Sequence, residues 1–421
     1  MKKVLLALGL LLLLGGGGTA AILIWNERQT ADVRGSSTRE FVPTEEPATT
    51  TRPVEEVEEE PWPLYGVNAA RTKVVADLSH RPPFRRTWTF RGGSLLEFPP
   101  VVAYEHLYLG TNEGRFVAVD AATGEVTWEH RFNRCMAASP AVGDGVVYAA
   151  LMVPKPCGSG QANRDAPGFV IAFEAETGEQ LWRFQAGGVE SSPLLVDGVV
   201  YFGSWDRKIY AVDAETGKEI WSFETGDEVK GSVAYAKGTV YVGSYDGNVY
   251  ALNAKTGKLR WRSGGRGGLT GAGNWYATPA VAYGRVYIGN TDGKVYAFGA
   301  RTGDLLWAHG TGSYVYSSAA VWDKKVLVGS WDGKLYALDA ATGDEVWSFK
   351  AGGAISGAPT VMDGVVYFAT TKGTQRTYGL DARTGERGWV FPDGKYTPLV
   401  ADSERVYIVG YSRIHALEPT A

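Results

Sequence analysis

The stretch Ala211-Val212-Asp213-Ala214-Glu215-Thr216-Gly217-Lys218-Glu219-Ile220-Trp221 decides the fold, because its centre recurs along the chain. The recurring phrase is Thr-Gly, three residues and then Trp. Seven copies begin at Thr123, Thr177, Thr216, Thr256, Thr302, Thr342 and Thr384, with spacings of 54, 39, 40, 46, 40 and 42 residues. A period near forty residues is typical of a repeat protein in which each unit is one supersecondary element.

One repeat unit predicts four short strands. Between Trp182 and Trp221 the apolar runs cover 192–196, 199–203, 208–212 and 219–223. Each run is rich in β-branched and aromatic residues, and turn residues such as Asp-Gly or Thr-Gly separate them. A four-stranded sheet cannot bury both of its faces alone, so copies must stack around an axis. The repeat therefore predicts an all-β protein with the β-propeller fold.

The number of blades follows from the two ends of the repeat region. Eight runs have the pattern of inner strands, starting at 99–102, yet only seven Thr-Gly phrases are present. The last unit lacks an outer strand, while 86–90 is a spare strand upstream of the first unit. Pairing of these two ends would leave no open sheet edge. We therefore predict an eight-bladed β-propeller over residues 84–421.

The tryptophan in each phrase is expected to pack between neighbouring blades. A buried indole removes roughly 150–250 Å² from water, so a repeated tryptophan contributes strongly to the contacts between sheets. The Asp-Ala-x-Thr-Gly turn before it supplies side-chain acceptors for turn amides and a glycine for a left-handed backbone. The expected docking residues are Trp88, Trp128, Trp182, Trp221, Trp261, Trp307, Trp347 and Trp389.

Three segments precede the ring. Residues 4–25 carry no charge and follow Lys2-Lys3; as a helix they would extend about 33 Å, enough to cross a bilayer. We expect residues 1–25 to be an uncleaved membrane anchor, and a cleaved signal is the alternative. Residues 26–61 are rich in Thr, Pro and Glu and predict a disordered linker, and 62–83 form a lead-in segment. The propeller would then lie on the extracytoplasmic side of the cell membrane.

The two cysteines lie in connections expected at one end of the same blade. Cys135 precedes an inner strand, and Cys157 is in the enlarged loop between the second and third strands. Two interpretations stay open from sequence: a disulfide, which an exported compartment would allow, or two free thiols.

Several kinds of site have no support in the sequence. The net charge of −4 gives no basic face for nucleic acid. The five histidines form no pair at metal-ligand spacing, and no Gly-x-Ser-x-Gly elbow is present. We therefore predict no catalytic, cofactor-binding or metal-binding residue.

A binding surface is expected at one end of the ring. The loops entering the inner strands and the turns between second and third strands meet there, and they carry many aromatic residues and some charges. The predicted rim residues are Glu190, Trp205, Lys230, Tyr245, Trp275, Tyr276, Tyr314, Tyr316, Trp331 and Tyr396.

The phrase Ala-x-Asp-x-x-Thr-Gly-x-x-x-Trp, intact at 211–221 and 337–347, resembles the tryptophan-docking repeat of pyrroloquinoline quinone (PQQ) propellers. The segment Trp62-Pro63-Leu64-Tyr65-Gly66 also resembles the lead-in of such proteins. The enzymatic branch implies PQQ and calcium held near adjacent cysteines; Cys135 and Cys157 are not adjacent, and no calcium ligand or base can be matched. The compact blades are similar to the non-enzymatic BamB-type propellers, which bind a partner protein.

These observations predict a membrane-anchored, extracytoplasmic PQQ-like propeller. It would act without catalysis, as a module that binds an envelope or membrane protein, with no cofactor expected. The alternatives are a PQQ-dependent oxidoreductase and a propeller that senses a small ligand or sugar.

Overall fold

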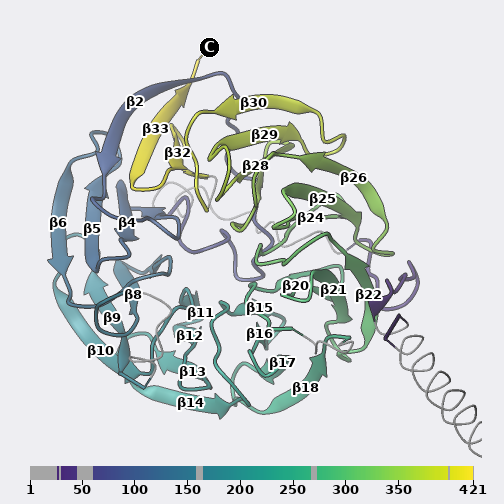
Figure 1. The fold of residues 1–421 in the computed structure, drawn as a ribbon. Coiled ribbons are helices and arrows are strands. Elements are labelled where there is room, and N and C mark those ends of the chain that lie inside the picture. The colour runs from purple at the N-terminus through teal and green to yellow at the C-terminus, as the bar shows by residue number, and fades with distance from the viewer. Residues whose placement is uncertain are drawn as a thin grey trace, which may run out of the picture.

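The strands form a closed ring of sheets, as the sequence predicts. The computed structural model describes residues 26–27, 30–44, 60–157, 165–266, 273–396 and 399–420. Within those ranges, eight sheets stand side by side around one axis (Figure 1). Each sheet is an antiparallel meander whose first strand lies innermost, and these sheets are the eight predicted blades.

The first four blades are regular four-stranded units. Blade 1 contains β3 (Val101–Ala103), β4 (His106–Gly110), β5 (Arg115–Asp120) and β6 (Val126–Arg131). Blade 2 contains β7 (Ala141–Gly143), β8 (Val146–Leu151), β9 (Gly168–Glu174) and β10 (Gln180–Ala186). Blade 3 contains β11 (Leu194–Val196), β12 (Val199–Gly203), β13 (Lys208–Asp213) and β14 (Glu219–Glu224). Blade 4 contains β15 (Ala234–Ala236), β16 (Thr239–Gly243), β17 (Asn248–Asn253) and β18 (Leu259–Gly264).

The remaining blades include the two that the N-terminal region completes. Blade 5 contains β19 (Ala280–Ala282), β20 (Arg285–Gly289), β21 (Lys294–Gly299) and β22 (Leu305–Gly310). Blade 6 contains β23 (Ala320–Trp322), β24 (Lys325–Gly329), β25 (Lys334–Asp339) and β26 (Glu345–Lys350). Blade 7 contains β27 (Thr360–Met362), β28 (Val365–Ala369), β29 (Thr377–Asp381) and β30 (Arg387–Phe391), with β1 (Val74–Val75) beside β27. Blade 8 contains β31 (Leu399–Ala401), β32 (Val406–Val409), β33 (Arg413–Pro419) and β2 (Phe84–Arg91).

The two ends of the repeat region close the ring. Strand β2 pairs antiparallel with β33 from Phe84 opposite Pro419 to Arg91 opposite Arg413. Figure 1 shows the early and late strands meeting in this blade. The predicted closure is confirmed, and it leaves blade 8 with the same four strands as its neighbours.

Each docking tryptophan lies between its own blade and the next. The Trp221 indole donates a hydrogen bond to the Ala254 carbonyl, 2.8 Å away, and its rings lie over Gly257 of blade 4. The same arrangement joins Trp182 to Gly217 and Trp88 to Gly124. Thr-Gly and Trp therefore act in pairs across seven of the eight seams, with the glycine leaving room for the indole. At the seam between blades 7 and 8, Trp389 packs on Phe84 of β2 instead.

Residues 62–75, called the axial segment below, run through the middle of the ring. The middle residues of inner strands donate backbone N–H groups to it; for example, Val142 bonds Pro63, Val281 bonds Ala70 and Val321 bonds Thr72. Figure 1 shows this segment crossing the centre. Inner strands of three residues would otherwise leave buried backbone groups unpaired, so the axial segment satisfies the inner edges of several blades.

Two basic side chains of the axial segment lie in the core. Arg71 and Lys73 are at most 1% exposed. The Arg71 Nε donates to the Val233 carbonyl at 2.9 Å, and the Lys73 ammonium donates to the carbonyls of Arg71 and Ala319. Burial lowers the pKa of Lys73 well below its usual range. The two side chains thus link the axial segment to blades on several sides of the axis.

Residues 30–44, called the strap below, pack on blade 5. Val33 exchanges two backbone hydrogen bonds with Ala308 of β22, and Phe41 packs on Tyr283 at 5.4 Å between ring centroids. The buried Arg285 donates to strap carbonyls, including that of Arg39 at 2.7 Å. Expecting a disordered linker over all of 26–61 is therefore wrong for 30–44. Its acids and bases pair with blade 5 and blade 6, so a composition averaged over the linker hides a docked element.

The predicted anchor, residues 1–25, lies outside the described residues. So does most of the remaining linker. In the described ranges, none of the helical residues belongs to a helix of the length and apolarity that a membrane crossing requires.

Candidate functional site

One residue from each blade surrounds the mouth of the ring, the end where the blades connect to one another. In every blade this residue stands four positions before the first residue of the inner strand. The set is Glu97, Ala137, Glu190, Lys230, Tyr276, Tyr316, Ser356 and Lys395. Turns between second and third strands form a second row outside it, with Trp205, Tyr245 and Trp331.

A charged cluster occupies the mouth at blades 3 to 5. The Glu190 carboxylate accepts hydrogen bonds from the Trp205 indole at 3.1 Å and the Tyr276 hydroxyl at 2.8 Å. The Lys230 ammonium lies 3.2 Å from Glu228 and 3.9 Å from Glu190. Burial raises the pKa of Glu190, and the charge of Lys230 opposes that shift. This cluster fixes the rim residues in one arrangement.

An aromatic cluster occupies the mouth at blades 5 and 6. Tyr316 packs edge-on against Tyr276, with 5.3 Å between ring centroids, and lies 5.4 Å from Trp331. Tyr314 contacts both Tyr316 and Trp331 and is 49% exposed. The ammonium of Lys372 lies 4.6 Å from the Trp331 ring. The cluster presents aromatic surface, and tyrosine and tryptophan are enriched at protein-binding surfaces.

The cysteines are joined near this face. The structure contains a disulfide between Cys135 and Cys157, whose Cα atoms are 5.4 Å apart. Both pack in a small cluster with Phe98 and Trp205. The bridge therefore supports the Trp205 side of the mouth.

Trp275 is not a rim residue, and the sequence prediction is wrong there. Its side chain has no exposed surface and packs on Tyr296 and Phe298. It stands five positions before its inner strand, where blades 4 and 6 place Val229 and Val315. In each case a glycine of the second strand faces that side chain; a Cβ on Gly243 would lie 2.3 Å from Trp275 Cβ. Tyr396, by contrast, lines the mouth as predicted.

Glu97 belongs to the mouth and was missed from sequence. It lines the same cavity as Lys230, Tyr276, Tyr316 and Tyr396. The signal that identifies it is register: Glu97 stands four residues before β3, as Glu190 does before β11. Burial, together with the nearby Glu190 charge, raises the pKa of Glu97 from 4.5 to about 7.

Replacing this carboxyl is expected to change how stability depends on pH. A raised folded-state pKa means that Glu97 stabilises the fold below the unfolded pKa and that this contribution is lost as pH rises through about 7. Glu97→Gln removes that loss. The melting temperature of the variant relative to wild type should therefore increase between about pH 5 and about pH 8. A difference that stays constant over this range would contradict the assignment.

The space at the axis does not fit PQQ. The mouth cavity, floored by Tyr65 of the axial segment, has a volume of about 60 Å³. Pockets that hold a cofactor such as PQQ usually have a volume of roughly 300–1,000 Å³. In the described residues, no group of three or more His, Cys, Asp or Glu side chains is placed to hold a metal ion. We derive no redox step for this chain.

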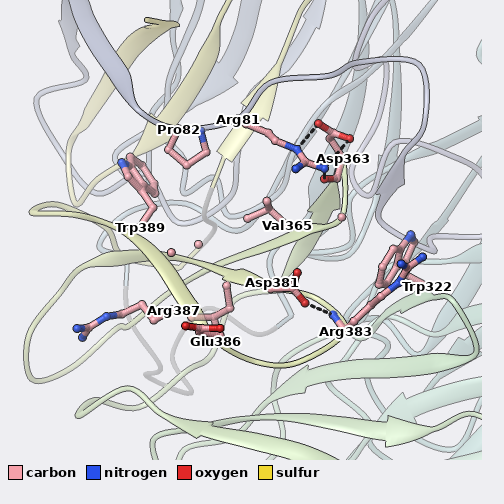
Figure 2. Close-up of a pocket in the computed structure, with 14 residues that line it drawn as sticks. Arg81, Pro82, Trp322, Asp363, Val365, Asp381, Arg383, Glu386, Arg387 and Trp389 are labelled. Atoms are coloured by element: carbon pink, nitrogen blue, oxygen red, sulfur yellow. Dashed lines mark hydrogen bonds and ion pairs between the residues drawn. The ribbon is translucent and has the colours of Figure 1, made fainter.

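A larger hollow of about 600 Å³ lies at the opposite end of blade 7. Figure 2 shows Trp389 and Pro82 on one wall and Arg81 turned toward Asp363. The Arg81 guanidinium donates to the Asp363 carbonyl oxygen at 2.8 Å and pairs with its carboxylate. Gly379 and Gly388 leave part of the space open. Arg81 and Asp363 are paired with each other, and Arg383 is paired with Asp323, so the mouth remains the better candidate.

Comparison with known proteins places the chain in a family. The profile described as outer membrane protein assembly factor BamB (PQQ_2) matches residues 69–204, 161–229, 205–319 and 291–420. The chain belongs to this family. The fold and the resemblance to PQQ-like propellers are thereby confirmed.

Solved structures share the fold at low identity. BamB from Moraxella catarrhalis superposes with a TM-score of 0.61 and 18% identity, covering 80% of this chain and 98% of that one. A europium-containing methanol dehydrogenase superposes with a TM-score of 0.67 and 15% identity, covering 85% of this chain and 92% of that one. The computationally designed Ika8 protein superposes with a TM-score of 0.64 and 18% identity, covering 80% of this chain and 100% of that one. BamB, a methanol dehydrogenase and a designed protein share the scaffold, so the fold alone does not assign a function.

Similar curated proteins match over short stretches. The dehydrogenase subunit of a quinone alcohol dehydrogenase from Gluconobacter oxydans (strain 621H) is 38% identical over 89 residues, 18% of this chain and 11% of that protein. Polyvinylalcohol dehydrogenase from Sphingopyxis sp. (strain 113P3) is 29% identical over 139 residues, 33% of this chain and 20% of that protein. The chain thus matches a fifth or less of the length of these two relatives.

Proposed function

We propose that the chain is a membrane-anchored, extracytoplasmic propeller that binds another protein of the cell envelope through its mouth face, without catalysis. The observation that carries this proposal is the aromatic cluster beside the charged cluster at the mouth. Trp205, Tyr245 and Trp331 form its outer row. Large aromatic side chains are enriched where proteins bind each other.

Side chains fill the centre of the ring, which favours binding at the surface of the protein over a reaction in a central pocket. Tyr65, Arg71 and Lys73 occupy the position where a central ligand would sit, and the remaining cavity of about 60 Å³ holds little more than water. Membership of the BamB family supports a protein partner, because the family description names an assembly factor. The matches to quinone dehydrogenases cover 11% and 20% of those enzymes, so they support a shared fold and not a shared activity.

The test compares proteins captured from solubilised membranes by two variants. Trp205→Ala/Tyr245→Ala/Trp331→Ala removes the outer row at the mouth. Leu181→Ala/Ile220→Ala/Val346→Ala removes three apolar residues, 47% to 51% exposed, on outer strands away from the mouth. We expect the mouth variant to lose a partner that wild type and the outer-strand variant retain, because truncating a buried interface anchor costs about 2 kcal/mol or more.

Three results would contradict the proposal. Capture of the same proteins by both variants would exclude the mouth as the binding face. Dye reduction by purified protein supplied with PQQ and Ca²⁺ would show the oxidoreductase alternative. Thermal stabilisation by a sugar or another small molecule, without a protein partner, would show the sensing alternative.

A further inference from the structure

The strap fixes the place where the chain enters the propeller. The ammonium of Lys294 bonds the carbonyls of Thr30 and Ala31, and the Asp32 carboxylate accepts the backbone N–H of Gly310. All of these contacts are at the outer edge of blade 5, where Figure 1 shows the strap beside β22. The chain therefore reaches the ring at one point of its circumference.

That point is close to any anchor formed by the first 25 residues. Thr30 is only five positions after Trp25, and an extended chain of five steps spans at most about 17 Å. A spacer of thirty-six residues, as the linker was expected to be, would leave the propeller free to turn. The docked strap removes most of that freedom and keeps the edge of blade 5 near the membrane surface.

The neighbouring outer edge of blade 4 is basic. Lys255, Lys258, Arg260 and Arg262 are exposed on β18 and the turn before it. No Asp or Glu occurs between Asn253 and Thr291. In the part of the chain that the structure describes, no carboxylate forms an ion pair with these four side chains.

The outer edge of blade 3 differs from that of blade 4. Its outer strand and the turn before it carry the exposed acids Glu215, Glu219 and Glu224, and Glu215 stands at the position of Lys255. On the strap, Arg34 and Arg39 are bound to Asp344 and Asp304. The unpaired basic strip thus lies next to the point of chain entry. Leu259 in the middle of the strip is 45% exposed, which adds apolar surface.

We propose that the outer edge of blade 4 binds the anionic headgroups of the membrane lipids, so that the propeller stands on its edge with blades 4 and 5 toward the bilayer. This inference rests on the anchor of the proposed function. Basic side chains near an anionic surface are attracted by the surface potential, which acts within a Debye length of about 8–10 Å. The short connection holds the strip within that range.

The experiment uses the full chain reconstituted into vesicles of phosphatidylcholine, with or without phosphatidylglycerol. The native cysteines are bonded to each other, so one introduced thiol takes a fluorophore. Thr256→Cys places it on blade 4, and Thr87→Cys places it on blade 8, across the ring. Energy transfer to headgroup-labelled lipid should be stronger from position 256, and phosphatidylglycerol should raise it there and not at position 87.

Charge variants test the chemistry of the contact. Lys258→Gln/Arg260→Gln/Arg262→Gln should abolish the increase in energy transfer that phosphatidylglycerol causes at position 256. Each basic residue strengthens binding to an anionic surface about fivefold, and three together about a hundredfold. Arg85→Gln/Arg86→Gln/Arg91→Gln on blade 8 removes the same number of charges, and this variant should still show the increase at position 256. Equal transfer from both positions, or a rise that survives the blade 4 variant, would overturn this inference alone. Release of the protein from the vesicles by alkaline washing would overturn the anchor and this inference together.

Discussion

A chain shortened to begin at Arg91 is expected to lose its cooperative thermal transition, because it lacks the strand that closes the ring. β2 is the outer strand of blade 8 and pairs with β33 along its length. It also carries Trp88, whose indole donates to the Ala121 carbonyl at 3.1 Å and lies over Gly124 of blade 1. Without β2, β33 loses its outer pairing partner, and the seam between blades 8 and 1 loses its indole.

Two longer chains distinguish the stabilisation that comes from the closing strand from the stabilisation that comes from the axial segment. A chain that begins at Glu60 retains both, and one that begins at Phe84 retains only the strand. Differential scanning calorimetry should give a higher melting temperature for the chain that begins at Glu60 than for the one that begins at Phe84, and no cooperative peak for the one that begins at Arg91. If the chains starting at Phe84 and Arg91 melt alike, pairing of the chain ends does not stabilise the ring.

Gly257→Ala is expected to destabilise the propeller by about 3 kcal/mol or more, since it combines backbone strain with displacement of an indole. Gly257 has a φ of +68°, and a Cβ there would lie 2.8 Å from the ring of Trp221. Trp221 is only 8% exposed and is held by its bond to Ala254, so it has little room to move. The ring would have to leave the seam between blades 3 and 4.

Gly238→Ala in the same blade is the matched control. Its φ of +70° imposes the same strain, but nothing lies within 4 Å of the added Cβ. We expect a cost of about 1–2 kcal/mol from strain alone. Urea denaturation of both variants measures the difference. Equal costs would mean that the indole contributes little to the seam.

The scaffold was predictable because its determinants repeat. The Thr-Gly and Trp positions recur at a nearly constant spacing, and both take part in the same contact, seen at Gly257 and Trp221. Blade number and closure followed from counting strands at the two ends. The rim was partly predictable for the same reason, because Glu190, Lys230 and Tyr276 share one register.

The features that do not repeat could not be predicted. The strap docks through contacts specific to blade 5, such as those of Arg285, and its composition resembles a linker. The axial segment is satisfied by inner strands that are distant in sequence. Trp275 looked like a surface aromatic because its loop is enlarged, yet it occupies a core position facing Gly243. In each case the deciding partner lies far along the chain.

The seam in blade 8 also sets the order in which this protein can fold. Thr87 of β2 bonds Ala416 of β33 across 329 residues of sequence. Bringing the ends of so long a loop together costs about 5 kcal/mol in chain entropy. A ribosome must release nearly the entire polypeptide before this contact forms, so a nascent chain keeps the edge of its last blade unpaired until its final residues arrive.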